Sequence, residues 1–465
     1  MMLLQEAAQA LNARWRGENV LFTGVSTDSR TLKSGDLFVA LSGERFEGSR
    51  FVRAAQNNGA VAAMVGLNAD DDVLSTDISF LQVDDTRLKL GQLAAFWRGR
   101  FSMPVIAVTG SNGKTTVKDM LAAILCQSLG NADITGQSIS ANSRVLATEG
   151  NLNNDIGMPL MLLRMRDTHR YAVIEMGMNH MGEIAYLTQL AKPDVAVVTN
   201  AGLAHIQGLG TVEAVAQAKG EIFSGLAEHG TAIVNADDRY ASLWHRFAGS
   251  RRIIDFGLGQ QAKQAQVFAE YQADGYDSSL QLHLPDGVVN VNLQVPGVHN
   301  IRNALAAAAA AVAVEIDGKT IAAGLENFRG VRGRLQRKKG LRHSVLIDDS
   351  YNANPESVRA ALAVLTAAAG KRILVLGDMG ELGESSVDLH RTIGEEARHA
   401  KLDKLLTLGE LSQFASAAFG QGAEHFNSMD ELLDVAESLL NEDVTVLVKG
   451  SRFMRMERVV DRLEA

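Results

Sequence analysis

Residues 105–116 read VIAVTGSNGKTT and pass from an apolar run into a glycine-rich, basic segment. The apolar run predicts a buried strand, and the glycine-rich segment predicts a loop whose backbone N–H groups approach phosphate oxygens. The loop is shorter than the common G-x-x-x-x-G-K-[ST] pattern, because Val108 stands where that pattern begins with glycine. The candidate nucleotide-binding residues of this loop are Gly110, Ser111, Asn112, Gly113, Lys114, Thr115 and Thr116.

An amphipathic helix is predicted directly after the loop. Apolar side chains recur at the spacing of one helical face, at Val117, Met120, Leu121, Ile124 and Leu125. A helix that starts at a glycine loop offers its N-terminus to an anion. We therefore expect Lys114 to neutralise phosphate charge and Thr115 to offer its hydroxyl group to Mg²⁺. A glycine turn that only caps the helix is the alternative interpretation.

The composition is that of a soluble globular protein with several domains. The chain has 465 residues, of which 21% are charged, and this length predicts about two to four domains. The net charge of −9 argues against a nucleic-acid partner, since a protein that binds nucleic acid usually carries a basic surface. An anionic ligand therefore needs a local basic site.

The cysteine usage and the apolar segments indicate a cytoplasmic protein without membrane insertion. The single cysteine, Cys126, lies among apolar residues and is expected to be a buried thiol, with a catalytic role as the alternative. The chain opens without the pattern of a signal peptide. The most apolar stretch, residues 304–314, is shorter than a membrane-spanning helix and predicts a buried core helix.

Three α/β regions are predicted along the chain. They are a small unit over residues 1–84, a central P-loop ATPase-like unit with a mostly parallel sheet over 85–313, and a Rossmann-like unit over 314–465. Alternating apolar and polar residues between 264 and 296 predict an antiparallel insert in the central unit. The polar stretch 131–150 is interpreted as a loop. The last unit lacks the G-x-G-x-x-G fingerprint, so a dinucleotide is not expected there.

Three polar residues of the central region allow two interpretations each. Glu175 ends an apolar strand, where it can hold magnesium or remain a solvated strand-end acid. His205 follows the next strand and, taken alone, favours a structural role over a ligand role. Lys219 lies beside the apolar face of a predicted helix, and its ammonium group is expected to reach water.

A second group of polar residues surrounds the junction with the last region. Asn300 and Asn303 share one face at the start of an alanine-rich helix, where they can contact a nucleotide or cap the helix. Arg334 lies in a basic stretch that is either a solvated surface or the source of one arginine for a triphosphate. Asp349 follows a predicted strand and suits a ribose, a metal or a polar turn.

Together and in this order, the motifs resemble the Mur ligases, a family of ATP-dependent, amide-forming enzymes of peptidoglycan synthesis. The shortened loop TGSNGKTT is the form of the phosphate loop found in that family. The resemblance covers nearly the whole chain. Its other motifs are STDSRTLKSGDLFVALSGERFEG (26–48), GNLNNDIGMP (150–159), AKGEIFSGL (218–226), DDSYNANP (348–355), GDMGELG (377–383) and LVKGSR (447–452).

The resemblance implies a role for each candidate residue. Lys114 contacts the γ-phosphate, and Lys219 is a lysine that becomes carbamylated, which turns its amine into an oxygen ligand for metal. Lys114, His205, Lys219 and Arg334 are the implied catalytic residues. Two Mg²⁺ ions are implied, with Thr115, Glu175, His205 and Lys219 as ligands. Implied ATP contacts beyond the loop are Asn300, Asn303, Arg334 and Asp349, and implied contacts to the UDP-linked substrate are Ser29, Arg30, Asn153 and Asn154.

The resemblance also implies a reaction. The terminal carboxylate of a UDP-linked muramoyl tripeptide attacks ATP, and the resulting acyl phosphate is attacked by the amine of D-alanyl-D-alanine. These small molecules are the expected partners of a monomeric enzyme. The alternatives are a folylpolyglutamate synthetase, the sister ligase that adds the third amino acid, and a P-loop switch or motor. The uridine-type module argues against the first alternative. The missing D-[DN]-P-R signature argues against the second, and the shortened loop argues against the third.

Overall fold

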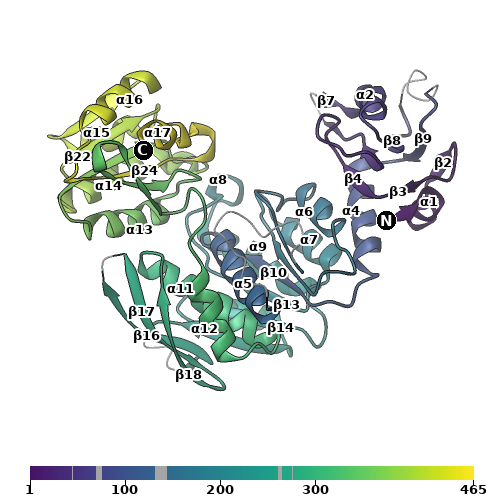
Figure 1. The fold of residues 1–465 in the computed structure, drawn as a ribbon, viewed down its shortest axis with the longest axis horizontal. Helices are drawn as coiled ribbons and strands as arrows, with labels where there is room; N and C mark the ends of the chain where they lie inside the picture. Colours follow the sequence, from purple (N-terminus) through teal and green to yellow (C-terminus); the bar gives the residue numbers. More distant parts are fainter. Residues whose placement is uncertain (44–45, 70–75, 131–143, 260–263, 275) are drawn as a thin grey trace.

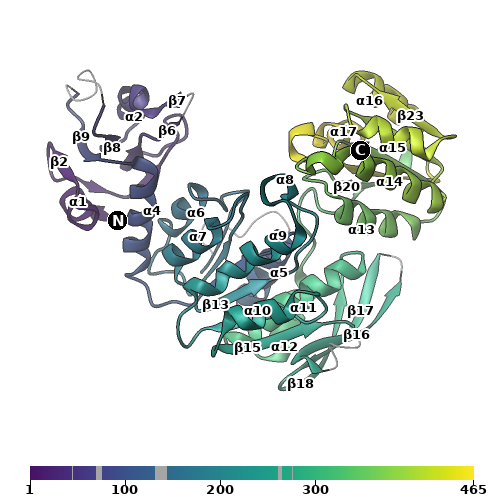
Figure 2. The same cartoon turned by 180° about the vertical axis from the view of Figure 1, so that it is seen from behind.

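The computed structural model describes the chain except residues 44–45, 70–75, 131–143, 260–263 and 275. Three sheets organise it, and each belongs to one region of the sequence. In Figure 1 the N-terminal and C-terminal regions lie on opposite sides above the central region, and Figure 2 shows the same arrangement from behind. Within the described part of the chain, no helix has the length and apolarity needed to cross a membrane.

The N-terminal region is built on a five-stranded sheet. Its strand order is β2-β9-β8-β5-β4, with β2 antiparallel and the other strands parallel. The sheet strands are β2 (Arg14–Arg16), β4 (Gly24–Ser26), β5 (Asp36–Val39), β8 (Ala62–Gly66) and β9 (Ser79–Val83), and two small ribbons pair β1 (Met2–Leu3) with β3 (Leu21–Phe22) and β6 (Ser42–Gly43) with β7 (Phe46–Glu47). Its described helices are α1 (Leu4–Leu11), η1 (Gly48–Phe51) and α2 (Val52–Asn57), and α4 (Thr86–Arg98) leads into the central region, where it packs on the helices that follow.

The central region is a nine-stranded sheet with a parallel part and an antiparallel edge. Its order is β11-β12-β10-β13-β14-β15-β16-β17-β18, and only the last three strands pair antiparallel. The parallel strands are β10 (Val105–Thr109), β11 (Val145–Ala147), β12 (Tyr171–Glu175), β13 (Val195–Val198), β14 (Thr231–Asn235) and β15 (Arg252–Gly257). The strands β16 (Val267–Asp274), β17 (Asp277–Leu284) and β18 (Gly287–Leu293) confirm the predicted antiparallel insert.

Helices cover both faces of the central sheet and bury its apolar strands. One face packs on α5 (Lys114–Ser128), α11 (Val298–Ala313) and α12 (Gly318–Asn327). The other face packs on α6 (Gly157–Leu162), α7 (Glu183–Ala191), α9 (Val212–Gly220), η2 (Glu221–Gly225) and α10 (Ala241–Ala248), while α8 (Ile206–Leu209) lies at the edge of the C-terminal region. Buried alanines along α11 confirm the predicted core helix, and the Cys126 thiol is buried in the same core.

The C-terminal region is a six-stranded sheet ordered β19-β20-β24-β21-β22-β23, with β19 antiparallel at its edge. Its strands are β19 (Gln336–Lys339), β20 (Val345–Asp349), β21 (Lys371–Gly377), β22 (Lys404–Leu408), β23 (Ala423–Phe426) and β24 (Val444–Lys449). Its helices are η4 (Leu341–His343), α13 (Pro355–Thr366), η5 (Gly383–Ser385), α14 (Ser386–His399), α15 (Ser412–Phe419), α16 (Met429–Ser438), η6 (Arg452–Met454) and α17 (Glu457–Leu463).

The structure differs from the sequence-based expectations at β11 and at the border near α12. The stretch 131–150 was interpreted as a loop, but Val145–Ala147 forms β11 at the sheet edge, and residues 131–143 lie outside the described part. Three residues are too few for a strand periodicity to be visible in the sequence. Helix α12 packs on α5, which favours a border after Asn327, whereas the sequence placed the border after residue 313.

Candidate active site

A cavity of about 1090 Å³ lies between the central and C-terminal regions. It forms at the carboxyl ends of parallel strands from both sheets, which is where open α/β sheets bind ligands. No described residue before Arg87 lines it. The predicted residues that line it are Ser111, Asn112, Gly113, Lys114, Thr115, Thr116, Asn153, Asn154, Glu175, His205, Asn300, Asn303, Arg334 and Asp349.

The glycine-rich loop connects β10 to the N-terminus of α5, as predicted. Gly113 is the N-cap of α5 with a φ of 84°, and a Cβ atom there would collide with the side-chain oxygen of Asn303. Lys114 Nζ donates to the Gly110 carbonyl oxygen at 2.8 Å. Burial lowers the pKa of Lys114, and the nearby charge of Glu175 opposes that shift. The loop therefore places a half-buried lysine at the start of a helix, where an anion is favoured.

Glu175 ends β12 with a buried and incompletely paired carboxylate. Asn153 Nδ2 donates to its Oε1 at 2.7 Å, and its own backbone N–H donates to Thr148 Oγ1 at 2.9 Å. Its Oε2 is buried and has no hydrogen-bond partner among the described residues. A solvated strand-end acid is therefore the wrong interpretation. A buried carboxylate oxygen without a partner is the kind of ligand that a hard cation such as Mg²⁺ prefers.

Lys219 lies on α9 and is fully buried, so the expectation that its amine reaches water is wrong. Its Nζ has no hydrogen-bond partner within the described part of the chain. Burial lowers the pKa of Lys219 well below its usual range, and the positive charge of Lys114 adds to the shift. Both effects favour the uncharged amine, which is the form that can react as a nucleophile.

His205 lies at the cavity and contacts the C-terminal region. Its Nδ1 lies 2.8 Å from Oε2 of Glu381, which follows β21. Burial lowers the pKa of His205, while Glu381 opposes the shift. His205 therefore lies at the cavity rather than in the apolar core, and its role as a metal ligand stays a prediction.

The two asparagines at the start of α11 form a buried pair. Asn300 Nδ2 donates to the Pro296 carbonyl oxygen at 2.8 Å, and Asn303 Nδ2 donates to Asn300 Oδ1 at 3.1 Å. The N-cap of α11 is Gly297, with no side-chain cap, so the capping interpretation is wrong. Asn303 instead lies against Gly113 of the phosphate loop.

Arg334 reaches the phosphate loop from the segment that leads into the C-terminal sheet. Its Nη2 donates to Thr115 Oγ1 at 3.1 Å. Its guanidinium carbon lies 4.4 Å from the ring centre of Tyr351, and that of Arg452 lies 5.7 Å from the same ring. The aromatic ring contacts the arginine favourably, and Arg334 has no ion pair with an acid among the described residues.

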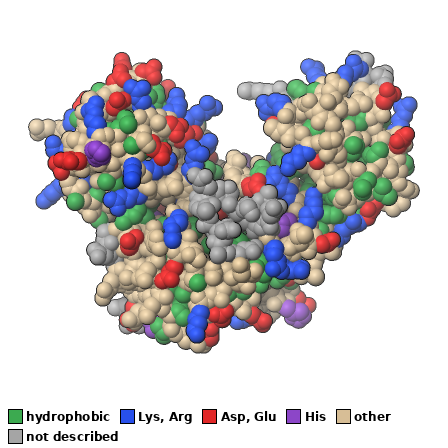
Figure 3. All heavy atoms as spheres, in the orientation of Figure 1, with side chains coloured by type: hydrophobic (Ala, Val, Ile, Leu, Met, Phe, Trp, Pro, Cys, Tyr) green, Lys and Arg blue, Asp and Glu red, His purple; other side chains and the backbone are tan. Residues whose placement is uncertain are grey.

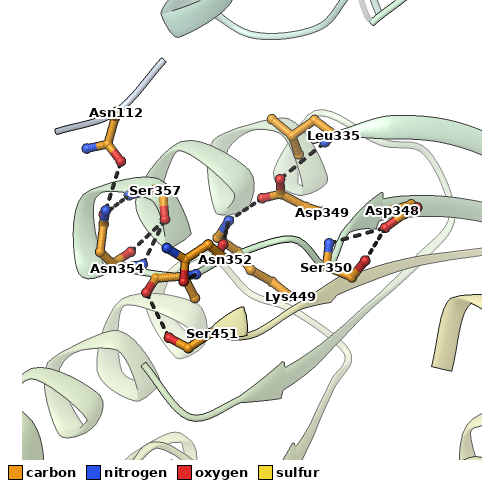
Figure 4. Close-up of polar contacts among 11 residues, drawn as sticks. Asn112, Leu335, Asp348, Asp349, Ser350, Asn352, Asn354, Ser357, Lys449 and Ser451 are labelled. Carbon is orange, nitrogen blue, oxygen red and sulfur yellow. Dashed lines mark hydrogen bonds and ion pairs between the residues drawn. The ribbon is translucent and has the colours of Figure 1, made fainter. Parts of the chain in front are cut away.

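Asp349 belongs to a buried polar network at the ends of β20 and β24, drawn in Figure 4. Lys449 Nζ lies 2.5 Å from Asp349 Oδ2 and donates to the Asn352 carbonyl oxygen at 3.0 Å. The Leu335 N–H donates to Asp349 Oδ1 at 3.2 Å. Burial raises the pKa of Asp349 and the Lys449 charge opposes the shift, so the pair forms an internally satisfied ionic contact.

The same network joins the C-terminal region to the phosphate loop. Asn354 Nδ2 donates to Asn112 Oδ1 at 2.8 Å, and Asn112 Nδ2 donates to Glu356 Oε2 at 3.1 Å. Glu356 Oε1 also accepts from the Leu203 N–H at 3.1 Å. The start of α13 is thus bonded to two loops of the central region, one of which is visible in Figure 4.

The remaining predicted residues lie elsewhere or hold local structure. Arg30 is exposed and pairs with Asp28 at 2.7 Å, and the Ser29 carbonyl oxygen accepts from Asn58 Nδ2 at 2.8 Å. Neither lines the cavity, and Figure 3 shows a gap between the N-terminal and C-terminal regions with basic side chains on both sides. Asn154 Oδ1 accepts from the Gly157 N–H at 2.8 Å at the start of α6. Gly110 and Lys219 also lie outside the cavity lining.

Glu356, Glu381 and Lys449 are among the cavity residues that were not singled out from the sequence. Lys449 had a visible signal, since it is a charged residue at the end of the apolar strand β24. Glu381 stands inside the GDMGELG motif, but nothing in that motif indicates which residue of the central region it contacts.

Whether the site suits magnesium is decided by its donor atoms. No cluster of three or more His, Cys, Asp and Glu side chains that could hold a metal occurs in the described ranges. Glu175 nonetheless offers a buried free carboxylate oxygen, and Thr115 a hydroxyl group at the same cavity. Oxygen donors of this kind fit Mg²⁺, and Lys219 fits it only after its amine has gained an oxygen-bearing group.

Three family models match the chain in succession. Residues 21–98 match the model described as "Mur ligase family, catalytic domain", residues 108–311 match "Mur ligase middle domain", and residues 333–452 match "Mur ligase, glutamate ligase domain".

Individual relatives resemble the chain over its whole length. It is 43% identical over 463 residues to UDP-N-acetylmuramoyl-tripeptide–D-alanyl-D-alanine ligase of Escherichia coli (strain K12), with 99% of this chain and 98% of that protein covered. A crystal structure of MurF from Acinetobacter baumannii aligns with a TM-score of 0.88 at 36% identity, covering 99% and 98% of the two chains. The MurF ligase of Thermotoga maritima in complex with ADP aligns with a TM-score of 0.79 at 26% identity, covering 96% and 98%.

Proposed function

The chain belongs to the Mur ligase family, and from this we propose that the cavity between its central and C-terminal regions is where it makes an amide bond. It is an ATP-dependent ligase that joins D-alanyl-D-alanine to UDP-N-acetylmuramoyl-tripeptide in the synthesis of the peptidoglycan precursor. The roles of individual residues, the metal ions and the placing of the substrates are the parts we propose here.

One contact carries the proposal for the ATP site. Arg334 lies 3.1 Å from Thr115 at the start of α5, so a cation from outside the central sheet reaches the phosphate loop. With Lys114 it supplies two positive charges where the γ-phosphate would lie. Phosphoryl transfer needs such positioning and charge neutralisation more than it needs a protein nucleophile. Asn300, Asn303 and Asp349 line the same cavity and are our candidates for contacts to the rest of the nucleotide.

We assign magnesium to the oxygen donors on the central side of the cavity. Thr115 and Glu175 would hold one ion, and His205 with a carbamylated Lys219 would hold a second. Magnesium supplies positive charge that offsets the charges of the phosphates. The buried amine of Lys219, whose pKa is lowered by burial, suits carbamylation, because only the unprotonated amine can form a bond to carbon dioxide.

The reaction proceeds in two displacements. A terminal carboxylate oxygen of the tripeptide bonds to the γ-phosphorus of ATP, the bond to the β-phosphate oxygen breaks, and ADP leaves. The free amine of D-alanyl-D-alanine then bonds to the carbonyl carbon of the acyl phosphate, inorganic phosphate leaves, and the amine loses its proton. Lys114 and Arg334 stabilise the charge of the first step, and the contacts of Asn112 with Asn354 and Glu356 hold the C-terminal region against the phosphate loop, which would help to keep water from the acyl phosphate.

The UDP end of the tripeptide substrate is assigned to the N-terminal region. Ser29 and Arg30 are the candidate contacts there, while Asn153 and Asn154 line the cavity nearer the peptide end. We further propose that the enzyme acts as a monomer in the cytoplasm, with functional units over residues 1–84, 85–313 and 314–465. The packing of α12 on α5 would move the second border to follow Asn327.

Phosphate release from ATP tests the proposal directly. Purified protein is given ATP and Mg²⁺ with a panel of UDP-muramoyl peptides and amine acceptors. Release is expected only when UDP-N-acetylmuramoyl-tripeptide and D-alanyl-D-alanine are both present, and chelation of Mg²⁺ should stop it. ATPase activity that responds to a macromolecule but to neither small substrate would instead support a switch or motor.

A further inference from the structure

The antiparallel insert of the central region contacts the segment that carries Arg334. Tyr276 lies in the turn between β16 and β17, and its hydroxyl group donates to the Leu335 carbonyl oxygen at 3.0 Å. The same side chain packs against the apolar core of the C-terminal region, and the guanidinium carbon of Arg337 in β19 lies 5.2 Å from its ring centre. Figures 1 and 2 both show β16 and β17 running up to the C-terminal region.

The backbone of the contacted segment is constrained. Gly333 and Leu335 have left-handed φ values of 72° and 50°, and leucine adopts this conformation only at a cost. Hydrogen bonds hold the peptide groups nearby. The Leu335 N–H donates to Asp349 Oδ1 at 3.2 Å, and the Gly333 carbonyl oxygen accepts from the Tyr351 N–H at 3.1 Å. The bond from Tyr276 then holds the other side of Leu335, so the strained residue is fixed through both its N–H and its carbonyl group.

Arg334 lies between these fixed peptide groups, and its side chain reaches the phosphate loop. Its Nη2 donates to Thr115 Oγ1 at 3.1 Å. A long arginine side chain has many rotamers, so the place of its guanidinium group depends on where its backbone is held. Because a reacting group that is displaced by about 1 Å can lose much of its effect, the position of this backbone matters for catalysis.

The contact from Tyr276 differs from the others in its origin. Asp349 ends β20 and Tyr351 follows it, so both belong to the C-terminal region. Tyr276 belongs to the central region, whose sheet also carries the phosphate loop after β10. Burial raises the pKa of Tyr276, so its hydroxyl group keeps the proton that it donates. The hydrogen bond therefore sets Leu335 directly against the sheet on which ATP is proposed to bind.

We propose that Tyr276 is a positioning residue for Arg334, and that the antiparallel insert serves to hold the Arg334 segment where its guanidinium group meets the phosphate loop. The inference rests on the proposed role of Arg334 at the γ-phosphate. It goes beyond that role because it gives a function to β16–β18, none of whose described residues lines the cavity.

The test is a double-mutant cycle on the first chemical step. Formation of ADP is measured in a single turnover, with enzyme in excess over ATP and with both other substrates present, so that product release does not limit the rate. Tyr276→Phe should slow this step by about 5- to 10-fold, the effect of one lost hydrogen bond. Arg334→Ala should slow it by about 10²- to 10³-fold. In the Arg334→Ala background, Tyr276→Phe should change the rate by less than about 2-fold, because the group that it positions is gone.

The matched control is Tyr271→Phe, which makes the same substitution in β16 of the same hairpin. Tyr271 is exposed, and its hydroxyl group has no hydrogen bond to a described residue, so this variant should keep the wild-type rate. Thermal unfolding verifies that every variant is folded.

The outcomes separate this inference from the function on which it rests. Equal slowing by Tyr276→Phe in both backgrounds shows an effect that does not pass through Arg334, and it overturns the positioning role, as does a wild-type rate in Tyr276→Phe. A wild-type rate in Arg334→Ala removes the proposed role of Arg334 and the inference with it. Phosphate release by the wild-type enzyme reports separately on the ligase activity.

Discussion

The central and C-terminal sheets face the same cavity with opposite states of their buried polar groups. On the central side, Glu175 Oε2 and Lys219 Nζ are buried without a hydrogen-bond partner among the described residues. On the C-terminal side, Asp349 is bonded to Lys449 and Leu335, and Asp378 accepts from two backbone N–H groups, of Leu411 and Ser412. Glu175, Asp349 and Asp378 lie at the carboxyl ends of parallel strands, whereas Lys219 lies on α9.

The unpaired groups of the central side are available to bind a ligand, whereas the paired groups of the C-terminal side stabilise the fold. A buried polar atom without a partner destabilises the folded chain, so such an atom indicates a site where a ligand or ion can bind. In the C-terminal network of Figure 4, hydrogen bonds and ion pairs among the residues themselves offset the loss of hydration. We therefore expect substitutions on the C-terminal side to reduce stability first, and substitutions on the central side to reduce activity first.

The largest effect is expected from Lys449→Met. This change leaves the carboxylate of Asp349 buried without its cation, and removal of one partner from a buried ion pair costs about 3–5 kcal/mol. Chemical denaturation should show a lower free energy of unfolding by that amount. The double variant Lys449→Met with Asp349→Asn should recover part of the loss. If the single variant were as stable as wild type, the Asp349–Lys449 pair would not stabilise the C-terminal region.

Lys219→Met should give the opposite result on the central side. Methionine keeps the shape of the side chain and removes an unpaired amine, so the free energy of unfolding should not fall, while phosphate release should drop by about 10²- to 10³-fold. Lys118→Met is the matched control, since Lys118 is a buried lysine that donates to the Thr148 carbonyl oxygen at 2.7 Å. It should lose about 1–3 kcal/mol of stability. Equal losses of stability in the two variants would remove the distinction.

His299 links the two sides through pH. It belongs to α11, and burial, with the charges of Lys449 and Arg302 nearby, lowers its pKa from 6.5 to about 4. The unfolded chain then binds the proton more tightly than the folded chain, so stability should fall as the pH is lowered from about 6.5 to about 4, by at most about 3 kcal/mol. His299→Gln should flatten this acid limb in denaturation curves. The exposed His399→Gln should not, and parallel curves for all three proteins would refute the assignment.

The smallest effect concerns the bond between the two sides. Asn354 caps α13 and also donates to Asn112, so Asn354→Ala should cost about 1 kcal/mol of stability and raise the KM for ATP by about 5-fold. Asp317 caps α12 without touching the phosphate loop. Asp317→Ala should therefore cost the same stability with an unchanged KM. If both variants change the KM equally, the contact with Asn112 is not what matters.

Local pattern and motif order predicted the strands, the antiparallel insert and most of the residues that line the cavity. What they could not predict depends on contacts between distant parts of the chain. The helical period placed Lys219 beside an apolar face, but only the packing of the neighbouring helices decides that its amine stays inside. His205 contacts Glu381 and Asn112 contacts Glu356, and both glutamates belong to the C-terminal region. No spacing in the sequence connects the members of either pair. The strand β11 was missed because three residues carry no period.

The alanines of α11 have a consequence for how the enzyme tolerates change. Residues 306–311 are all alanine and all buried, so over this run the helix contributes only methyl groups to its contacts with the sheet and the neighbouring helices. The same helix carries Asn300 and Asn303 at its start, where Asn303 meets Gly113. A larger side chain at a position of the run that faces the sheet would push the helix outward and draw both amides away from the nucleotide loop. The small alanine side chains thereby fix how closely the helix approaches the sheet, and with it the position of Asn300 and Asn303. Their size is therefore constrained by function.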